Sequence, residues 1–159
     1  MDWIFQAFVG AAVLHIFEEY FYPGAFPDFM KRTLPAFAPF ITTNFAIVVN
    51  GLFLALCILG AMVRMDAPIF GLSIAGLLTF NGLTHLMGSL RARSYAPGLI
   101  SGLLLHIPLG ITAYALFLNS GQLSITQALL SALLGVAYQV VPVGYLGLVS
   151  LMRRSNQSS

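Results

Sequence analysis

Residues 3–21 read WIFQAFVGAAVLHIFEEYF, an apolar stretch that carries the segment His15-Ile16-Phe17-Glu18-Glu19 near its end. A helix of about 20 apolar residues is long enough to cross a bilayer. Imidazole and carboxylate groups are costly in that setting and persist mainly where they face a bundle interior, pair with each other or bind an ion. The spacing puts Glu18 and Glu19 on either edge of the helix face that carries His15. The stretch therefore predicts a membrane helix that contributes to a buried functional site.

The composition of the whole chain supports a membrane protein. Hydrophobic residues make up 58% of the sequence and charged residues 8%, and the mean hydropathy is +0.90. These values lie far from those of a soluble domain. The 159 residues leave room for roughly five spans of about 20 residues each. We therefore expect an all-α, polytopic membrane helical bundle that forms a single domain, residues 1–159, embedded in a lipid bilayer. The net charge of +2 gives no indication of a nucleic-acid partner.

Five apolar stretches are the expected transmembrane helices, at residues 3–21, 40–63, 68–90, 97–118 and 126–151. With five crossings, Arg64 lies on one side of the membrane, and the other six basic residues lie on the opposite side: Lys31, Arg32, Arg91, Arg93, Arg153 and Arg154. The positive-inside rule then predicts an external amino terminus and a cytoplasmic carboxyl terminus. The first stretch lacks a basic leading segment and contains polar residues, so we expect no cleaved signal peptide.

The same topology places the three histidines at a similar depth. At about 1.5 Å per residue from the cytoplasmic helix ends, His15 lies roughly 9 Å deep, His85 roughly 8 Å and His106 roughly 13 Å. Asn81 precedes His85 by four residues and shares its helix face. A stripe of small residues around His106, namely Gly98, Gly102 and Gly110, predicts close approach of a neighbouring helix. His106 is therefore expected to face the bundle interior.

Three histidines and one carboxylate at one depth form a suitable first coordination shell for a divalent metal, zinc above all and iron as the second choice. The predicted ligands are His15, His85, His106 and either Glu18 or Glu19. Histidine and glutamate can also pair directly without a metal. Polar residues on the other helices are possible supporting groups, although hydrogen bonding between helices is the more usual role for such residues: Asn50, Tyr138, Gln139 and Tyr145. Pro108 and Pro142 are expected to kink or locally open their helices.

The connection between the first two spans, residues 20–39, is rich in aromatic residues and prolines. A short helix that opens at Pro27, with Phe29 turned toward the membrane and Lys31 and Arg32 toward the headgroups, fits an interfacial anchor. The segment is either a connector on the membrane surface or a lid over the His/Glu layer.

Three short motifs carry a resemblance to a known family. They are His15-Ile16-Phe17-Glu18-Glu19, Asn81-Gly82-Leu83-Thr84-His85 and Tyr95-Ala96-Pro97-Gly98-Leu99-Ile100-Ser101. In this order they resemble the HxxEE, NxxxH and YxPGxxT motifs of the HXXEE family of bacterial membrane proteins, with Ser101 in place of threonine. The resemblance implies a bacterial cytoplasmic (inner) membrane protein, presumed in its family to be an enzyme or a metal protein. It marks as key positions His15, Glu18, Glu19, Asn81, His85, Tyr95, Pro97 and Gly98.

The residues favour a membrane metalloenzyme with its site near the cytoplasmic leaflet, which hydrolyses a lipid or another apolar small molecule that enters from that leaflet. In this hypothesis one glutamate binds the metal and the other takes a proton from water. Asn81 orients a ligand or stabilises an oxyanion, and Tyr95 donates a proton. The alternatives are a metal-free acid–base enzyme, such as an isomerase, and a carrier or sensor that binds a metal ion, haem or a proton. The sequence identifies no protein partner.

Overall fold

The computed structural model describes residues 1–21 and 25–157, with side chains up to Met152. Every regular element in these residues is a helix, which confirms the all-α helical bundle. The bundle is built from five long helices: α1 (Trp3–Tyr20), α3 (Thr43–Val63), α4 (Pro68–Ala92), α6 (Ile107–Asn119) and α7 (Ile125–Gln157). The shorter elements are α2 (Phe26–Thr33), η1 (Pro35–Phe40), η2 (Arg64–Asp66), α5 (Leu99–Ser101) and η3 (Gly102–His106).

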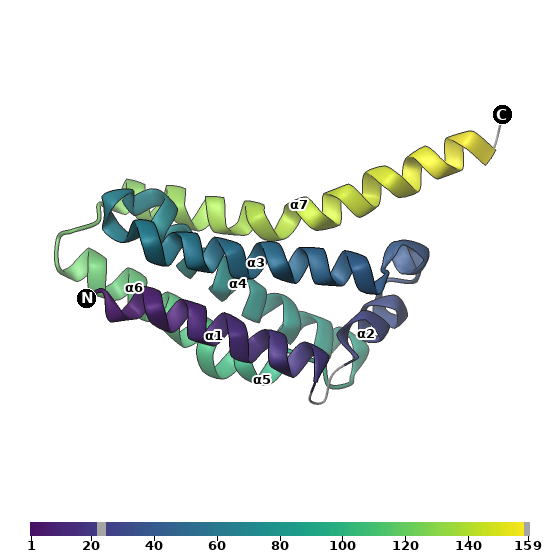
Figure 1. The fold of residues 1–159 in the computed structure, drawn as a ribbon, viewed down its shortest axis with the longest axis horizontal. Coiled ribbons are helices and arrows are strands. Elements are labelled where there is room, and N and C mark those ends of the chain that lie inside the picture. Colours follow the sequence, from purple (N-terminus) through teal and green to yellow (C-terminus); the bar gives the residue numbers. More distant parts are fainter. Residues whose placement is uncertain (22–24, 158–159) are drawn as a thin grey trace.

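The long helices run up and down in turn, so the two ends of the chain lie at opposite ends of the bundle (Figure 1). α2, η1 and the turn before α5 lie at the end where α1 finishes. The helices begin and end close to the predicted apolar stretches, except that α7 continues to Gln157. α7 also continues through Pro142, and its last part leads away from the other helices (Figure 1).

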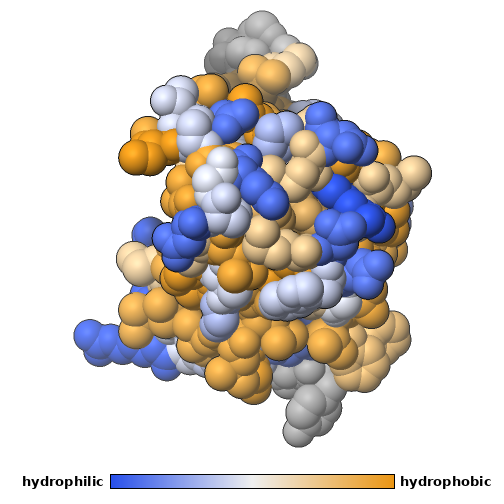
Figure 2. Space-filling model, turned by 90° about the vertical axis from the view of Figure 1, so that its left-hand side faces the viewer, coloured by the Kyte–Doolittle hydropathy of each residue, from blue (hydrophilic) through white to orange (hydrophobic). Residues whose placement is uncertain are grey.

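Four segments are long and apolar enough to cross a membrane: Thr43–Asp66, Pro68–Ala92, Leu99–Asn119 and Ile125–Met152. α1, the first predicted span, is not among them, because His15, Glu18 and Glu19 make it less apolar. Polar groups gather on the end of the bundle near the amino terminus, and hydrophobic residues flank them (Figure 2). Such a distribution is typical of a protein whose sides face lipid and whose ends face water.

One face of α1 is buried along its whole length. Ile4, Phe5, Phe8 and Ala12 join the hydrophobic core, and the same face continues into the buried polar residues His15, Glu18 and Glu19. The apolar residues fix the rotation of α1 about its axis because they recur with helical spacing. The polar side chains that follow are therefore held in the bundle interior.

α4 packs against α1, α3, α6 and α7 and lies at the centre of the bundle. Two glycines of the predicted stripe, Gly102 and Gly110, pack against the backbone of α4. A Cβ atom at Gly110 would lie 2.6 Å from the Ala75 carbonyl oxygen, and one at Gly82 would lie 2.7 Å from the Gly102 carbonyl oxygen. Only glycine allows backbones to approach this closely. The contacts hold Asn81 and His85 of α4 opposite the helix that carries His106.

Candidate metal centre

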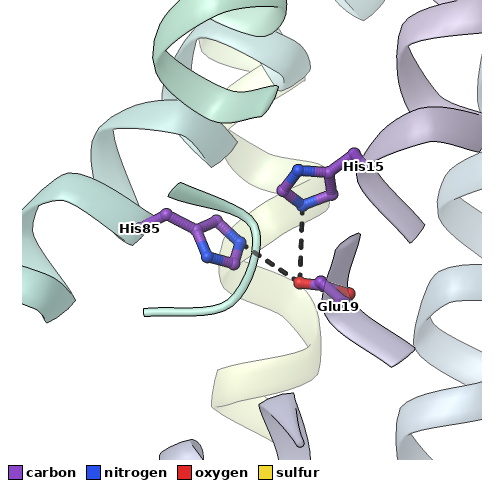
Figure 3. Close-up of side chains that lie close together, drawn as sticks. All are labelled: His15, Glu19 and His85. Atoms are coloured by element: carbon purple, nitrogen blue, oxygen red, sulfur yellow. Dashed lines mark ion pairs between the residues drawn. The ribbon is translucent and has the colours of Figure 1, made fainter. Parts of the chain in front are cut away.

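The structure brings together three of the predicted ligands, His15 and Glu19 from α1 and His85 from α4 (Figure 3). Their ligand atoms all lie within 4.8 Å of one another. Oε1 of Glu19 lies 3.4 Å from Nε2 of His15 and 3.2 Å from Nε2 of His85. All three residues are buried. One carboxylate oxygen thus faces two imidazole nitrogens in a setting from which water is excluded.

Glu18 lies outside this group, and its carboxylate is occupied elsewhere. It accepts hydrogen bonds from the backbone N–H groups of Gly98, Ile100 and Ser101, at 3.1, 2.9 and 2.7 Å. The Tyr95 hydroxyl and the Ser101 hydroxyl also donate to it. These N–H groups belong to the first turn of α5, where a helix has donors without partners and favours negative charge. Glu18 therefore caps α5 from a neighbouring helix.

Ser101 connects Glu18 to the histidine cluster. Its Oγ lies 2.5 Å from Oε2 of Glu18 and 2.8 Å from Nδ1 of His15. A hydroxyl has one hydrogen, and an ionised carboxylate can only accept. When Ser101 donates to Glu18, it must accept from Nδ1–H of His15. The lone pair of His15 is then on Nε2, the nitrogen that faces Glu19.

His106 lies beside the group but not in it. Its ring centroid is 4.3 Å from that of His15, and its Nδ1 lies 2.9 Å from Oδ1 of Asn81. With an amide oxygen at Nδ1, the hydrogen of the neutral ring is on Nδ1 and the lone pair is on Nε2. The Nε2 atom is buried and has no hydrogen-bond partner in the described structure. Asn81 thus orients an imidazole whose other nitrogen is unpaired.

Asn50 is the only one of the four possible supporting residues whose described hydrogen bonds reach the cluster. Its Nδ2 donates to Oε2 of Glu19 at 2.7 Å and to the Tyr20 hydroxyl at 3.2 Å. This bond holds the Glu19 carboxylate and leaves Oε1 directed at the histidines. Tyr138 contacts Ser73 instead. Tyr145 is exposed on α7 and lies outside the site.

Gly98 explains the tight turn between Tyr95 and α5. Its φ of +94° is in the left-handed region, and a Cβ atom there would lie 2.6 Å from Cε1 of both His15 and His85. Only glycine combines that backbone conformation with that approach. Ala96 and Pro97 are buried beside it, and Tyr95 is partly exposed with its hydroxyl bonded to Glu18.

The segment that carries His106 is a π-helix, η3, rather than a continuous α-helix. The Ile107 N–H bonds to the Gly102 carbonyl, and Pro108 follows in the first turn of α6. Pro108 has no N–H for the carbonyl four residues earlier, so the local opening expected at this proline takes the form of a wider turn. π-Turns frequently occur at functional sites.

α2 covers the cluster from the end of the bundle. The Phe26 ring lies 5.0 Å from the His85 ring, and Phe29 is buried with its ring edge against Gly88 of α4. Phe29 therefore packs into the bundle and is not turned toward the membrane, as the interfacial-anchor expectation had it, because α2 folds back onto α4. Residues 22–24 of the expected lid lie outside the described residues.

Three contributions to the site do not follow from the sequence. The motif shows Ser101 only as a replacement for threonine, hydrogen bonding between helices is the more usual role for a residue such as Asn50, and Phe26 belongs to a loop rich in aromatic residues. All three act through contacts between segments far apart in the chain, and no local spacing reports such contacts.

A family model described as "Protein of unknown function with HXXEE motif" matches residues 6–113, more than half of the chain. The chain belongs to the HXXEE family. The matched region contains every residue of the cluster described above and ends before α7. Neither the comparison with curated proteins nor the comparison with solved structures found a match.

Proposed function

We propose that this HXXEE protein is a membrane-embedded metalloenzyme whose metal ion is held by His15, Glu19 and His85. Zinc is the first choice and iron the second, since both bind two histidines and a carboxylate and keep further positions open. One observation carries the proposal. The Ser101 contact turns a lone pair of His15 toward Glu19 Oε1, and two acceptors that face each other at 3.4 Å need a metal ion or a proton between them.

The metal would polarise a substrate carbonyl or activate a water molecule. Hydrolysis also needs a base, and the Glu18 carboxylate, which accepts from five groups, has no oxygen left for that role. His106 is better placed. Its Nε2 is unpaired, and Asn81 holds the ring in the tautomer that accepts a proton there. The other glutamate of the motif, Glu18, positions His15 through Ser101.

An apolar substrate is supported by a groove of about 440 Å³ between α1 and the η3–α6 segment. It runs along the side of the bundle and reaches residues that adjoin His15 and His106 in the chain. Its lining contains one polar side chain, Thr112, and the other lining residues are apolar: Trp3, Ala7, Gly10, Ala11, Leu14, Leu104, Leu105, Pro108 and Leu109. A lipid chain can enter such a groove directly from the bilayer.

The test is elemental analysis of the purified full-length protein together with turnover on a panel of lipid esters and amides. We expect about one zinc or iron per chain. Glu19→Gln and His85→Ala should both lose most of it, because each removes one of three ligands. Asp66→Asn removes an exposed carboxylate far from the cluster and serves as the matched control. His106→Ala should keep the metal and lose roughly 10²- to 10⁴-fold in turnover.

Full metal content in both ligand variants would exclude this centre.

A second candidate, a metal-free acid–base enzyme, is favoured by the distance of 3.2 Å between His85 Nε2 and Glu19 Oε1, which allows a direct hydrogen bond. Wild-type protein without bound metal that still turns over an apolar substrate would support that candidate instead.

A further inference from the structure

A second pocket, separate from the histidine cluster, lies at the end of the bundle where α1 finishes. Its volume is about 340 Å³. It is formed by the last two turns of α2 and by the end of α4 with the turn that follows, and its lining residues are Phe29, Arg32, Thr33, Arg91, Ala92 and Ser94. The lining thus contains two arginines and no acidic residue.

Neither arginine is neutralised within the described part of the chain. The ion pairs there outside the histidine cluster join Lys31 to Asp28 and Arg64 to Asp2. Arg32 and Arg91 therefore present two uncompensated positive charges to one pocket. Guanidinium groups bind phosphate oxygens through paired N–H donors, and two of them on one pocket match a single phosphate group.

The position of the pocket indicates where the phosphate comes from. Arg91 lies in the last turn of α4, one of the four segments able to cross a membrane. The end of such a segment lies at the level of the lipid headgroups. Phe29 and Ala92 add an apolar side to the pocket, which suits a ligand that continues into an acyl region.

We propose that this pocket binds the phosphate group of an anionic phospholipid. Arg32 and Arg91 contact the phosphate oxygens, and Ser94 also lines the pocket. The bound headgroup connects α2 to α4 and so holds in place the helix whose Phe26 covers His85. The proposal does not depend on a metal at the cluster, because none of its residues belongs to that group.

The test measures binding of short-chain phosphatidylglycerol to the purified full-length protein by native mass spectrometry, with phosphatidylcholine and inorganic phosphate as competitors. We expect phosphatidylglycerol to bind, phosphatidylcholine to compete weakly and inorganic phosphate to compete least. The double variant Arg32→Gln/Arg91→Gln should lower phosphatidylglycerol affinity at least tenfold. Arg93→Gln is the matched control, since Arg93 is an exposed neighbour that does not line the pocket.

Two results would overturn the proposal. If Arg93→Gln weakened binding as much as the double variant, the lipid would respond to general surface charge and not to this pocket. If inorganic phosphate competed as well as the lipid, the pocket would be a free-phosphate site. Metal content, measured on the same samples, should be unchanged in all variants, so failure here is distinguishable from failure of the proposed metal centre. Circular dichroism checks that the variants are folded.

Discussion

The Ser101 hydroxyl has two polar neighbours at short distance, the Glu18 carboxylate and the His15 imidazole. It can donate its one hydrogen to only one of them. Since the carboxylate must accept, the serine sets the tautomer of His15 and directs Nε2 toward Glu19. Residues that orient a metal ligand in this way commonly affect metal affinity by about 10- to 100-fold.

Ser101→Ala should therefore weaken metal binding by about 10- to 100-fold, because Nδ1 of His15 loses its partner. Ser101→Thr is the control and should bind metal as the wild type does, since threonine keeps the hydroxyl. Competition with a chelator of known affinity measures both variants. Equal affinity in the alanine variant would show that His15 is not positioned through Ser101.

Gly98 gives a second prediction about a single residue. Gly98→Ala should abolish high-affinity metal binding, because the added Cβ would lie 2.6 Å from Cε1 of both His15 and His85. Gly121→Ala is a matched control. Gly121 also has a positive φ, +70°, but nothing lies within 4 Å of an added Cβ. It should cost about 1 kcal/mol of unfolding free energy and leave metal binding intact. If both variants lost metal to a similar extent, backbone strain would be the cause of the loss and not the contact with the histidines.

Much of the helical fold follows from the sequence, and the reason lies in the length of the apolar runs. The stretches at 68–90 and 97–118 each predict one helix, and α4 and the α5–η3–α6 segment occupy these positions. The face of α1 that carries His15 also follows from helical spacing. The roles of the two glutamates do not. Adjacent carboxylates differ only through what the rest of the chain brings to them, here the turn at Gly98 for Glu18 and Asn50 for Glu19.

The groove between α1 and α6 leads to a prediction about these two elements. A Cβ at Gly10 meets nothing within 4 Å, so Gly10→Leu should fold normally while filling the groove. We expect labelling of α1 and α6 by a photoactivatable fatty acid to fall several-fold in this variant. Gly51→Leu is the control, because Gly51 of α3 is equally open and does not line the groove. Peptide mapping by mass spectrometry locates the label. Unchanged labelling of α1 and α6 would mean that lipid chains do not occupy the groove.

Charge differs between the two ends of the bundle. Arg64 lies at the end near the amino terminus, and its side chain is paired with Asp2 at 2.7 Å. Arg32, Arg91 and Arg93 lie at the other end. Arg153 and Arg154 follow on α7, but their side chains lie outside those that the structure describes. The pairing of Arg64 with Asp2 leaves the positive charge concentrated at one end, which the positive-inside rule assigns to the cytoplasm.

We therefore predict that Ser94 is cytoplasmic and that Ser120 is external. Cys57 is buried and is the only cysteine of the chain, so a single added cysteine provides the reactive thiol. A maleimide that cannot cross membranes should label Ser120→Cys in spheroplasts and should label Ser94→Cys only after lysis. Both serines are exposed, so accessibility to the reagent does not differ for other reasons. Labelling of both variants in intact spheroplasts would place the two ends of the bundle on one side and exclude five crossings. The opposite pattern would keep the crossings and invert the orientation, and the histidine cluster would then open toward the outer face.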